Sequence, residues 1–330
     1  MIERFVCFDR PRRMRCGTCQ HEWHVTAEWL ERFNQALENC PVCGTDCRGE
    51  GRPDFCAEPG GPLRDDAAIR EFSWYHSSTQ ENWPDKSFDP AAELTDLTKQ
   101  RMKGMGLSVE GWAARQKAKA LHVGTYEAAI ENVFRRMDDQ SGSLEQFYLY
   151  RVQLSPDCRI EPGVHLEPTD FVGNAHLADV CAPGTTVLRY VNVHEDPSSV
   201  SLALEPDAIH AVQRIQIPLP VDAAEPWVRN ATARLVEASS KASAQPMDGR
   251  KPWHQQRISA LASEAGRLES EVAAGLPMGL RRRFRARFNE AAFDAAPASL
   301  PTRLVGLARL VTDAQSVLDA LDLQPGRKVT

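Results

Sequence analysis

The sequence predicts an α+β protein with a small metal-stabilised N-terminal module, a central split and mixed β-sheet, and a C-terminal helical region. Two C-x-x-C pairs occur within the first 50 residues, short strand-like runs surround one amphipathic helix in the middle, and long helical patterns follow. We therefore divide the chain into residues 1–55, a linker at 56–70 rich in Gly, Pro and charge, a central domain at 71–220 and a helical domain at 221–330.

The composition indicates a globular protein with an uneven charge distribution. The chain has 330 residues, of which 42% are hydrophobic, and a net charge of −6, which argues against nucleic-acid binding by the chain as a whole. From residue 221 onward there are 16 Lys and Arg against 12 Asp and Glu, a net charge of +4, so the remainder carries −10. This shift predicts that the helical region can be separated from the central domain.

Hydropathy and cysteine usage predict a cytoplasmic protein without a membrane span. No apolar run reaches the roughly 18 residues that a span needs, and the first residues lack the apolar stretch of a signal peptide. Nine cysteines, an odd number that includes two C-x-x-C pairs, favour metal binding in a reducing compartment over a disulfide framework.

The two C-x-x-C pairs predict a structural zinc site. Cys16 and Cys19 form the first pair, Cys40 and Cys43 form the second, and 20 residues separate the pairs. Four thiolates complete a tetrahedral site without an open position, which suits structural rather than catalytic Zn²⁺. The segment resembles a zinc ribbon or a treble-clef finger. Three other residues are candidates to replace one ligand: His21, His24 and Cys47.

Two further features of the N-terminal region concern its structure and its partners. The stretch from Thr26 to Leu37 places apolar side chains at helical spacing, and Thr26 is a suitable cap. Four arginines precede the first cysteine pair and can contact phosphate, but residues 1–50 hold eight acidic and seven basic residues, which cancels the long-range field. These arginines are Arg10, Arg12, Arg13 and Arg15.

Two short segments of the central domain end in small polar residues. The run from Phe72 to Thr79 has the pattern of an aromatic strand, and Leu121–Thr125 that of a second strand ending at a glycine. Thr125 can cap the amphipathic helix that follows. Gly124 lets a ligand approach the main chain, and the helix N-terminus can hold a phosphate. Residues 84–119 show no recognisable chemistry and are expected to form an insertion over the cleft.

The second half of the central domain carries the strands that the prediction is organised around. Residues 147–154, 187–193, 200–204 and 209–217 alternate or run apolar as strands do. Between the second and the third of these strands, turn residues interrupt the pattern and place Glu195 at the rim of a sheet. A carboxylate fixed at such a rim can serve catalysis or binding.

The residue pattern of this stretch resembles that of ADP-ribosyltransferase-like domains of phage and polymorphic-toxin proteins. Two shorter stretches resemble the diphtheria-toxin and poly-ADP-ribose polymerase branch: Trp74–Thr79 is similar to its first-strand motif, and His122-Val123-Gly124-Thr125 to its second block. The resemblance covers roughly residues 72–217. The residues that carry it in the second half of the domain are Asn192, Glu195, Asp196, Pro197, Ser199, Ser201, Pro206, Asp207, Ile209 and Val212.

The resemblance implies an NAD-dependent ADP-ribosyltransferase that modifies a macromolecular acceptor, possessing a toxin-like or phage-conflict role, with NAD as its substrate. Glu195 would stabilise an oxocarbenium-like transition state, and His76 would orient the nicotinamide-side ribose. Tyr75 or Tyr126 would stack on nicotinamide. The remaining cofactor-binding residues would line the floor of the cleft, although serine replaces the family's glycine at position 77: Ser77, Thr79, Gly124 and Thr125.

An alternative interpretation is a non-enzymatic zinc-ribbon adapter that binds nucleic acid or a protein partner. Four helices are expected in the tail, at residues 227–243, 252–274, 278–292 and 300–321. The third contains the only dense basic run of the chain, whose guanidinium groups can pair with phosphates or with an acidic partner. These arginines are Arg281, Arg282, Arg283, Arg285 and Arg287. The chain contains no phosphate-binding glycine motif, no H-E-x-x-H and no G-x-S-x-G.

Overall fold

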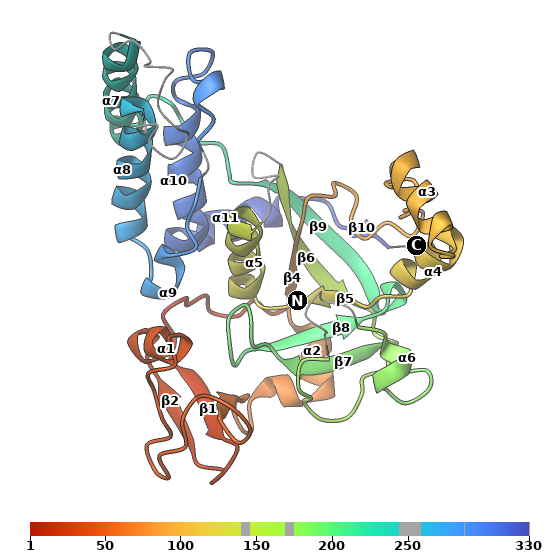
Figure 1. The fold of residues 1–330 in the computed structure, drawn as a ribbon. Coiled ribbons are helices and arrows are strands. Elements are labelled where there is room, and N and C mark those ends of the chain that lie inside the picture. The colour runs from red at the N-terminus through yellow and green to blue at the C-terminus, as the bar shows by residue number, and fades with distance from the viewer. Residues whose placement is uncertain (140–145, 169–174, 244–258, 287, 330) are drawn as a thin grey trace.

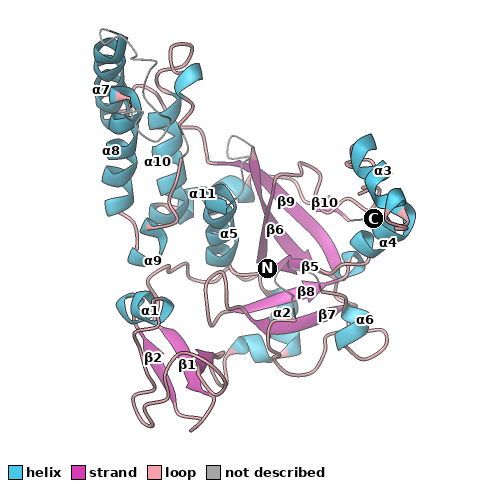
Figure 2. Cartoon of the chain, viewed as in Figure 1, coloured by secondary structure: helices cyan, strands magenta, loops and turns pink. Residues whose placement is uncertain are grey.

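A computed structural model describes residues 1–139, 146–168, 175–243, 259–286 and 288–329 (Figure 1). A small N-terminal module, two central sheets and a tall helical bundle are arranged around one long helix, α5 (Tyr126–Asp139). Figure 2 shows that the strands concentrate in the module and in the centre, whereas the C-terminal part is almost entirely helical. This is the α+β architecture that the sequence predicts.

The N-terminal module is a three-stranded antiparallel sheet covered by a short helix. The strand order is β2 (Glu22–Val25), β1 (Arg12–Cys16), β3 (Pro53–Phe55). Helix α1 (Ala27–Asn34) begins where the sequence predicts, because the Thr26 hydroxyl accepts a hydrogen bond from the backbone N–H of Trp29. A core this small depends on an additional staple, which the cysteines can supply.

The central strands form two separate sheets, so the predicted split is observed. Pairs between named strands are antiparallel in the described part of the chain, and parallel pairing occurs there only as isolated bridges such as His165 to Tyr190. The predicted mixed character is therefore limited to these bridges. The first sheet has the order β10 (Arg327–Lys328), β9 (Ile209–Ile217), β6 (Phe147–Leu154), β4 (Trp74–Ser78), and the second has the order β5 (Leu121–Val123), β8 (Val200–Leu204), β7 (Val187–Val191).

The two sheets meet along β4 and β5, which we call the seam. Within the described residues, these strands are joined by a single bridge, in which the N–H and C=O groups of Tyr75 and Gly124 exchange hydrogen bonds of 2.9 Å. Helix α5 starts directly after this bridge and covers the seam. Thr125 caps it, with its hydroxyl accepting from the N–H of Ala128 at 2.9 Å. A Cβ at Gly124 would lie 2.9 Å from both Ala128 Cβ and Ser201 Oγ, so only glycine fits there.

Short helices fill the connections of the centre. The segment predicted as a linker contains η1 (Pro62–Arg64) and α2 (Asp66–Glu71). The insertion contains α3 (Asp96–Gly104) and α4 (Val109–Lys117), which lie together at one end of the sheets (Figure 1). Two single-turn elements complete the connections, α6 (Leu177–Val180) and η2 (Pro206–Ala208).

The C-terminal helices share a hydrophobic core with the central domain. Buried side chains of α5, such as Phe134, belong to the same cluster as Leu235, Leu268 and Leu307 of the tail, and β10 returns to pair with β9. The charge shift near residue 221 therefore does not mark a break in the packing, and the structure argues against a separable tail. The bundle contains α7 (Pro226–Ser243), α8 (Ala260–Ala274), α9 (Met278–Arg281), η4 (Glu290–Ala292), α10 (Ser299–Thr312) and α11 (Ala314–Asp322). In the described segments, no helix combines the length and apolar character that crossing a membrane demands.

Candidate functional site

The four cysteines of the C-x-x-C pairs form one cluster at the tip of the N-terminal module. Their sulfur atoms all lie within 4.8 Å of one another, and the Cys16–Cys43 and Cys19–Cys40 Sγ–Sγ distances are both 3.6 Å. Tetrahedral thiolate ligation with metal–sulfur bonds of about 2.3 Å places the sulfurs about 3.8 Å apart. The cysteines are therefore already arranged as a metal-binding group, as predicted.

The three residues considered as replacements for a cysteine ligand lie outside the four-cysteine cluster. His24 contacts the Glu58 carboxylate, and the His21 ring stacks on Trp23 with 5.6 Å between centroids. Cys47 is buried but does not belong to the four-cysteine cluster. Among the described residues, this cluster is the group whose geometry could hold a metal ion. Four thiolates complete the coordination sphere of a tetrahedral ion, so a metal held here would be structural.

A second site lies at the seam, on the side covered by α5. It is a cavity of about 50 Å³, which we call the seam pocket. The structure brings five of the predicted site residues to its wall, from three segments that are far apart in sequence: Tyr75, His76, Ser77, Gly124 and Glu195. Three residues that were not predicted to form the site also line it: His122 and Asn192, which belong to the resembling motifs, and Asn132 of α5.

The seam pocket contains buried polar atoms without hydrogen-bond partners. They are Ser77 Oγ, His122 Nε2 and Asn132 Oδ1. The other ring nitrogen of His122 contacts the Tyr190 hydroxyl at 3.0 Å, and burial lowers the pKa of His122 to about 4, so its ring is neutral near pH 7. Buried polar atoms without partners are rare in folded proteins, and such a group commonly marks a site for water or a ligand.

Glu195 is held at the pocket by its neighbours. Its Oε1 accepts a hydrogen bond of 2.6 Å from Nε of Arg135 on α5. The Asn192 side chain fixes the loop, because its Oδ1 accepts from the N–H groups of His194 and Glu195 at 3.0 and 2.9 Å and its amide donates to Ser201. The position of Glu195 is thus set by packing and hydrogen bonding rather than by solvent, contrary to a freely solvated turn carboxylate.

His76 lies between the seam pocket and a larger neighbouring cavity. Its Nδ1–H donates to the backbone carbonyl of His122 at 2.8 Å, and its ring stacks on Trp83 with 3.9 Å between centroids. Burial lowers the pKa of His76 to about 3, so the ring is neutral near pH 7. His76 therefore offers a hydrogen-bonding and stacking surface rather than a positive charge.

Three predicted cofactor-binding residues are not brought to the seam pocket. The Thr125 hydroxyl donates to Asp196 Oδ2 at 2.7 Å, so it serves the loop and the helix cap. The Tyr126 hydroxyl donates to the Leu310 carbonyl at 2.8 Å, and its ring belongs to the core shared with the tail. Thr79 follows the end of β4 and does not line the pocket.

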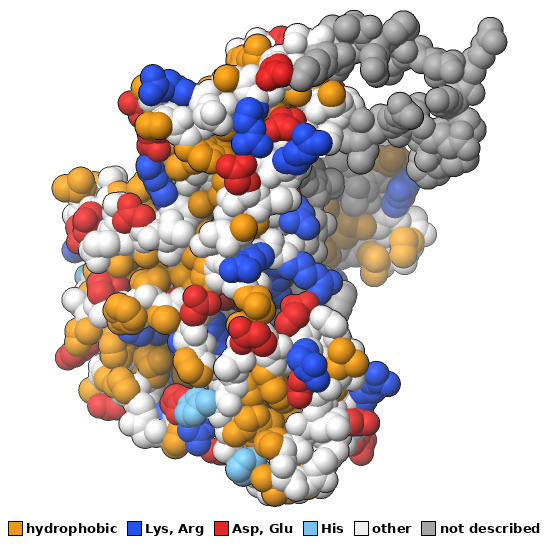
Figure 3. Space-filling model, turned by 90° about the vertical axis from the view of Figure 1, so that its left-hand side faces the viewer, with side chains coloured by type: hydrophobic (Ala, Val, Ile, Leu, Met, Phe, Trp, Pro, Cys, Tyr) orange, Lys and Arg blue, Asp and Glu red, His pale blue; other side chains and the backbone are white. Residues whose placement is uncertain are grey.

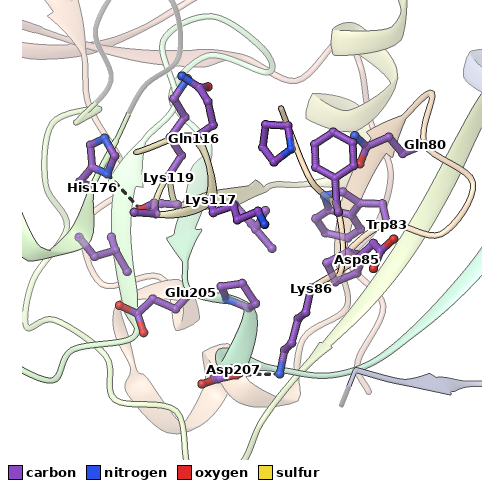
Figure 4. Close-up of a pocket in the computed structure, with 18 of the residues that line it drawn as sticks. Gln80, Trp83, Asp85, Lys86, Gln116, Lys117, Lys119, His176, Glu205 and Asp207 are labelled. Atoms are coloured by element: carbon purple, nitrogen blue, oxygen red, sulfur yellow. Dashed lines mark hydrogen bonds and ion pairs between the residues drawn. The ribbon is translucent and has the colours of Figure 1, made fainter. Parts of the chain in front are cut away.

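A cavity of about 740 Å³, which we call the large cavity, opens on the other side of Trp83. Figure 4 shows Trp83, Lys117 and Lys119 around it, with Glu205 and Asp207 on the opposite wall. Its wall includes much of the insertion at residues 84–119, for which the sequence indicated no chemistry. No sequence motif predicts this cavity, because helices and loops from four separate parts of the chain build it.

Asp196, the residue next to Glu195, is fully buried in a cluster of charges. Its Oδ1 accepts from Nη2 of Arg10 at 2.8 Å and forms an ion pair with Nη2 of Arg12 at 3.1 Å. Its backbone N–H donates to Glu131 Oε2 at 2.9 Å. Burial, and secondly the Asp196 charge, raise the pKa of Glu131 to about 7. Two arginines from the N-terminal segment thus fix the loop that carries Glu195.

The basic run of the tail is not one continuous helix face. Helix α9 ends at Arg281, whose Nε donates to the Leu276 carbonyl at 2.8 Å. Phe284 and Ala286 are buried after the helix ends, so the chain turns there and the expected helix over 278–292 is interrupted. Arg282, Arg283 and Arg285 project beside the N-terminal module, and Arg287 lies outside the described residues.

Comparison with known proteins gave no match: no family model, curated protein or solved structure is similar to this chain.

Proposed function

We propose that the protein is an NAD-dependent ADP-ribosyltransferase that holds the nicotinamide-side ribose at the seam pocket. The observation that supports this proposal is the convergence of residues 75–77, 122–124 and 192–195 on one cavity with three buried polar atoms lacking partners. These are the segments whose sequence motifs resemble those of ADP-ribosyltransferase-like domains. A hydroxyl, an imidazole nitrogen and an amide oxygen are suitable partners for ribose hydroxyls or a carboxamide.

In the proposed reaction, the bond between the ribose C1′ and the nicotinamide nitrogen breaks, and nicotinamide leaves with the bonding electrons. Positive charge develops on the ribose, and the Glu195 carboxylate stabilises it because Arg135 and Asn192 hold it in place beforehand. An acceptor nucleophile then attacks C1′ and loses its proton to solvent or to a nearby base. His76 acts as a neutral positioning group in this scheme.

Binding of NAD requires the seam pocket to widen. A cavity of about 50 Å³ holds water molecules rather than a nicotinamide riboside. In the described part of the chain one backbone bridge joins the two strands of the seam, so few backbone hydrogen bonds break when they move apart. The large cavity next to Trp83, at about 740 Å³, has the volume for the rest of a dinucleotide.

For the four-cysteine cluster we propose structural Zn²⁺. The ion prefers tetrahedral sulfur ligands, and cysteines Cys16, Cys19, Cys40 and Cys43 supply a complete set of them. Reduced thiols are maintained in the cytoplasm, where we place the protein. The metal would stabilise the N-terminal module and take no part in the chemistry at the seam.

The test is NAD⁺ cleavage by Glu195→Gln, with release of labelled nicotinamide as the readout. We expect turnover to fall by about 10² to 10³, because one preorganised electrostatic group is removed. Binding of NAD⁺, measured by calorimetry, should weaken far less. Glu71→Gln is the matched control, since Glu71 is exposed at the end of α2 and lines neither the seam pocket nor the large cavity. Glu205→Gln tests the competing carboxylate at the large cavity.

If Glu205→Gln abolishes cleavage while Glu195→Gln retains it, the catalytic residue is misassigned. If the wild-type protein neither binds nor cleaves NAD⁺, the enzyme proposal fails. The adapter interpretation would then stand. One observation favours it: Thr125 and Tyr126 of the resembling motif are used for packing.

A further inference from the structure

A third cavity, of about 530 Å³, lies where the N-terminal module, the Glu195 loop and the tail meet. We call it the basic cavity. Two regions of the chain supply its arginines. Arg10 and Arg12 lie just before and at the start of β1, and three more arginines follow α9: Arg282, Arg283 and Arg285. Figure 3 views this side of the molecule and shows basic side chains between the helical bundle above and the module below.

The wall of the basic cavity carries more positive than negative charge. Against the five arginines it contains three carboxylates, Asp9, Glu31 and Glu131. Arg10 and Arg12 are paired with the buried Asp196 behind the wall, so the arginines available to a ligand are Arg282, Arg283 and Arg285. Burial raises the pKa of Glu131 to about 7, so that group carries only part of its negative charge near neutral pH. An anionic ligand is therefore favoured there.

The arginines of the tail form long ion pairs, and Nη1 of Arg285 also donates to the Phe284 carbonyl at 2.8 Å. Arg282 lies 3.5 Å from Glu31, Arg283 3.9 Å from Glu131, and Arg285 3.5 Å from Glu269. Their side chains are 76%, 38% and 44% exposed, so these ion pairs are solvated and contribute little. A phosphate group, which accepts paired hydrogen bonds from guanidinium, would replace these contacts with stronger ones.

The cavity has apolar as well as charged walls. Phe8, Leu30 and Leu280 line it together with the arginines. This combination fits a nucleotide, whose base or sugar needs an apolar surface and whose phosphate needs guanidinium groups. The volume of about 530 Å³ suits one or two nucleotides rather than a duplex.

The loop of residues 192–199 forms a wall between the basic cavity and the seam pocket. His194 and Pro197 line the basic cavity, whereas Asn192 and Glu195 line the seam pocket. We infer that the basic cavity binds a nucleotide unit of single-stranded nucleic acid through its phosphate. Resting on the proposed function, we further infer that this strand is the acceptor presented to the ribose at the seam.

The binding part of the inference is tested without NAD⁺. A fluorescent single-stranded octanucleotide is titrated into the full-length, zinc-loaded protein, and anisotropy is measured at several salt concentrations. The test variant is the triple substitution Arg282→Gln, Arg283→Gln, Arg285→Gln. Arg229→Gln is the matched control, because Arg229 is exposed on α7 and does not line the cavity.

We expect the triple variant to bind at least tenfold more weakly than wild type. Its slope of log affinity against log salt should be shallower by about 0.7 for each phosphate that the variant no longer neutralises, and Arg229→Gln should bind as wild type does. Equal affinity of the triple variant and wild type, or no binding by wild type at low salt, would overturn the inference. So would displacement of the octanucleotide by an acidic peptide at equal charge concentration, which would mark a protein-binding site.

Hydrolysis of NAD⁺ to ADP-ribose and nicotinamide separates this inference from the proposed function. The triple variant should hydrolyse NAD⁺ at the wild-type rate and lose only transfer to the oligonucleotide. If it instead loses NAD⁺ binding while oligonucleotide binding is unchanged, the basic cavity belongs to NAD⁺ and the acceptor assignment is wrong. If wild type binds the oligonucleotide but never cleaves NAD⁺, the proposed function fails and the nucleic-acid site stands.

Discussion

Neutralising the adjacent carboxylates Glu195 and Asp196 should destabilise the protein to very different extents. Asp196 is fully buried, accepts from Arg10 and the Thr125 hydroxyl, and forms an ion pair with Arg12. Asp196→Asn removes its charge but keeps an acceptor, and asparagine tolerates the positive φ of 49° at this position. The substitution therefore isolates the electrostatic contribution of the buried carboxylate.

The magnitude follows from what remains around Arg12. Its side chain is only 6% exposed, and without the Asp196 charge its nearest carboxylate is Glu131 at 3.9 Å. Leaving one member of a buried ion pair without its partner costs about 3–5 kcal/mol. We expect about 3 kcal/mol for Asp196→Asn, at the low end because the amide oxygen still accepts hydrogen bonds.

Glu195→Gln should change stability far less. Its partner Arg135 is 41% exposed and can be solvated when the pair is broken, so the destabilisation should stay below about 1 kcal/mol. The assay is urea unfolding at pH 7 of the zinc-saturated protein, followed by tryptophan fluorescence, with the free energy of unfolding taken from the midpoint and slope. Equal midpoints for the two variants would refute the claim that Asp196 is a structural anchor and Glu195 is not. A double substitution with Arg12→Gln would show whether the cost arises from this pair.

Two further predictions concern the metal and pH. Cys40→Ser should lose the proposed Zn²⁺, which metal analysis measures, and full zinc retention would contradict the assignment. Amide hydrogen exchange at residues 192–199 should also become faster, because Arg12, the first residue of β1 in the N-terminal module, forms an ion pair with Asp196 of that loop. Burial raises the pKa of Glu131 from 4.5 to about 7, so its contribution to stability is complete below pH 4.5 and is lost as pH rises to about 7. As pH rises from 4.5 to 8, the free energy of unfolding of Glu131→Gln should therefore increase by roughly 3 kcal/mol relative to that of the wild type, measured by urea unfolding of both proteins at each pH. If the two free energies of unfolding change with pH in parallel, the Glu131 carboxyl is not buried as described.

Much of the local structure was predictable from the sequence because it depends on neighbours along the chain. Strands at 147–154, 200–204 and 209–217 coincide with β6, β8 and β9, since their β-branched, aromatic and aliphatic residues suit largely buried strands. The Thr125 cap and the cysteine cluster also follow from spacing over a few residues. Predictions of this kind require only the period of the pattern and the chemistry of the turn.

The contacts between distant segments were not predictable in the same way. Tyr126 has the pattern expected of a ligand-stacking residue, but its hydroxyl bonds to Leu310, 184 positions away, and the ring becomes part of the core. The arginines at positions 10 and 12 precede a cysteine pair and resemble a phosphate-binding run, yet their partner is Asp196. Asn132 was missed because it lies within an amphipathic helix pattern, where a lone polar residue carries no signal of a pocket.

The loop that carries Glu195 is shaped from outside the central domain. Asp196 and Ser198 have positive φ angles of 49° and 65°, which non-glycine residues adopt only when surrounding contacts hold them. Those contacts come largely from Arg10, whose Nη2 donates to the carbonyls of Asp196 and Pro197 at 3.3 and 3.2 Å. The backbone N–H of Arg13, in the metal-stapled sheet, donates to Ser198 Oγ at 3.2 Å. The N-terminal module thus helps to fix Glu195 at the seam pocket without lining that pocket, so the four-cysteine cluster and the candidate catalytic carboxylate belong to one folding unit.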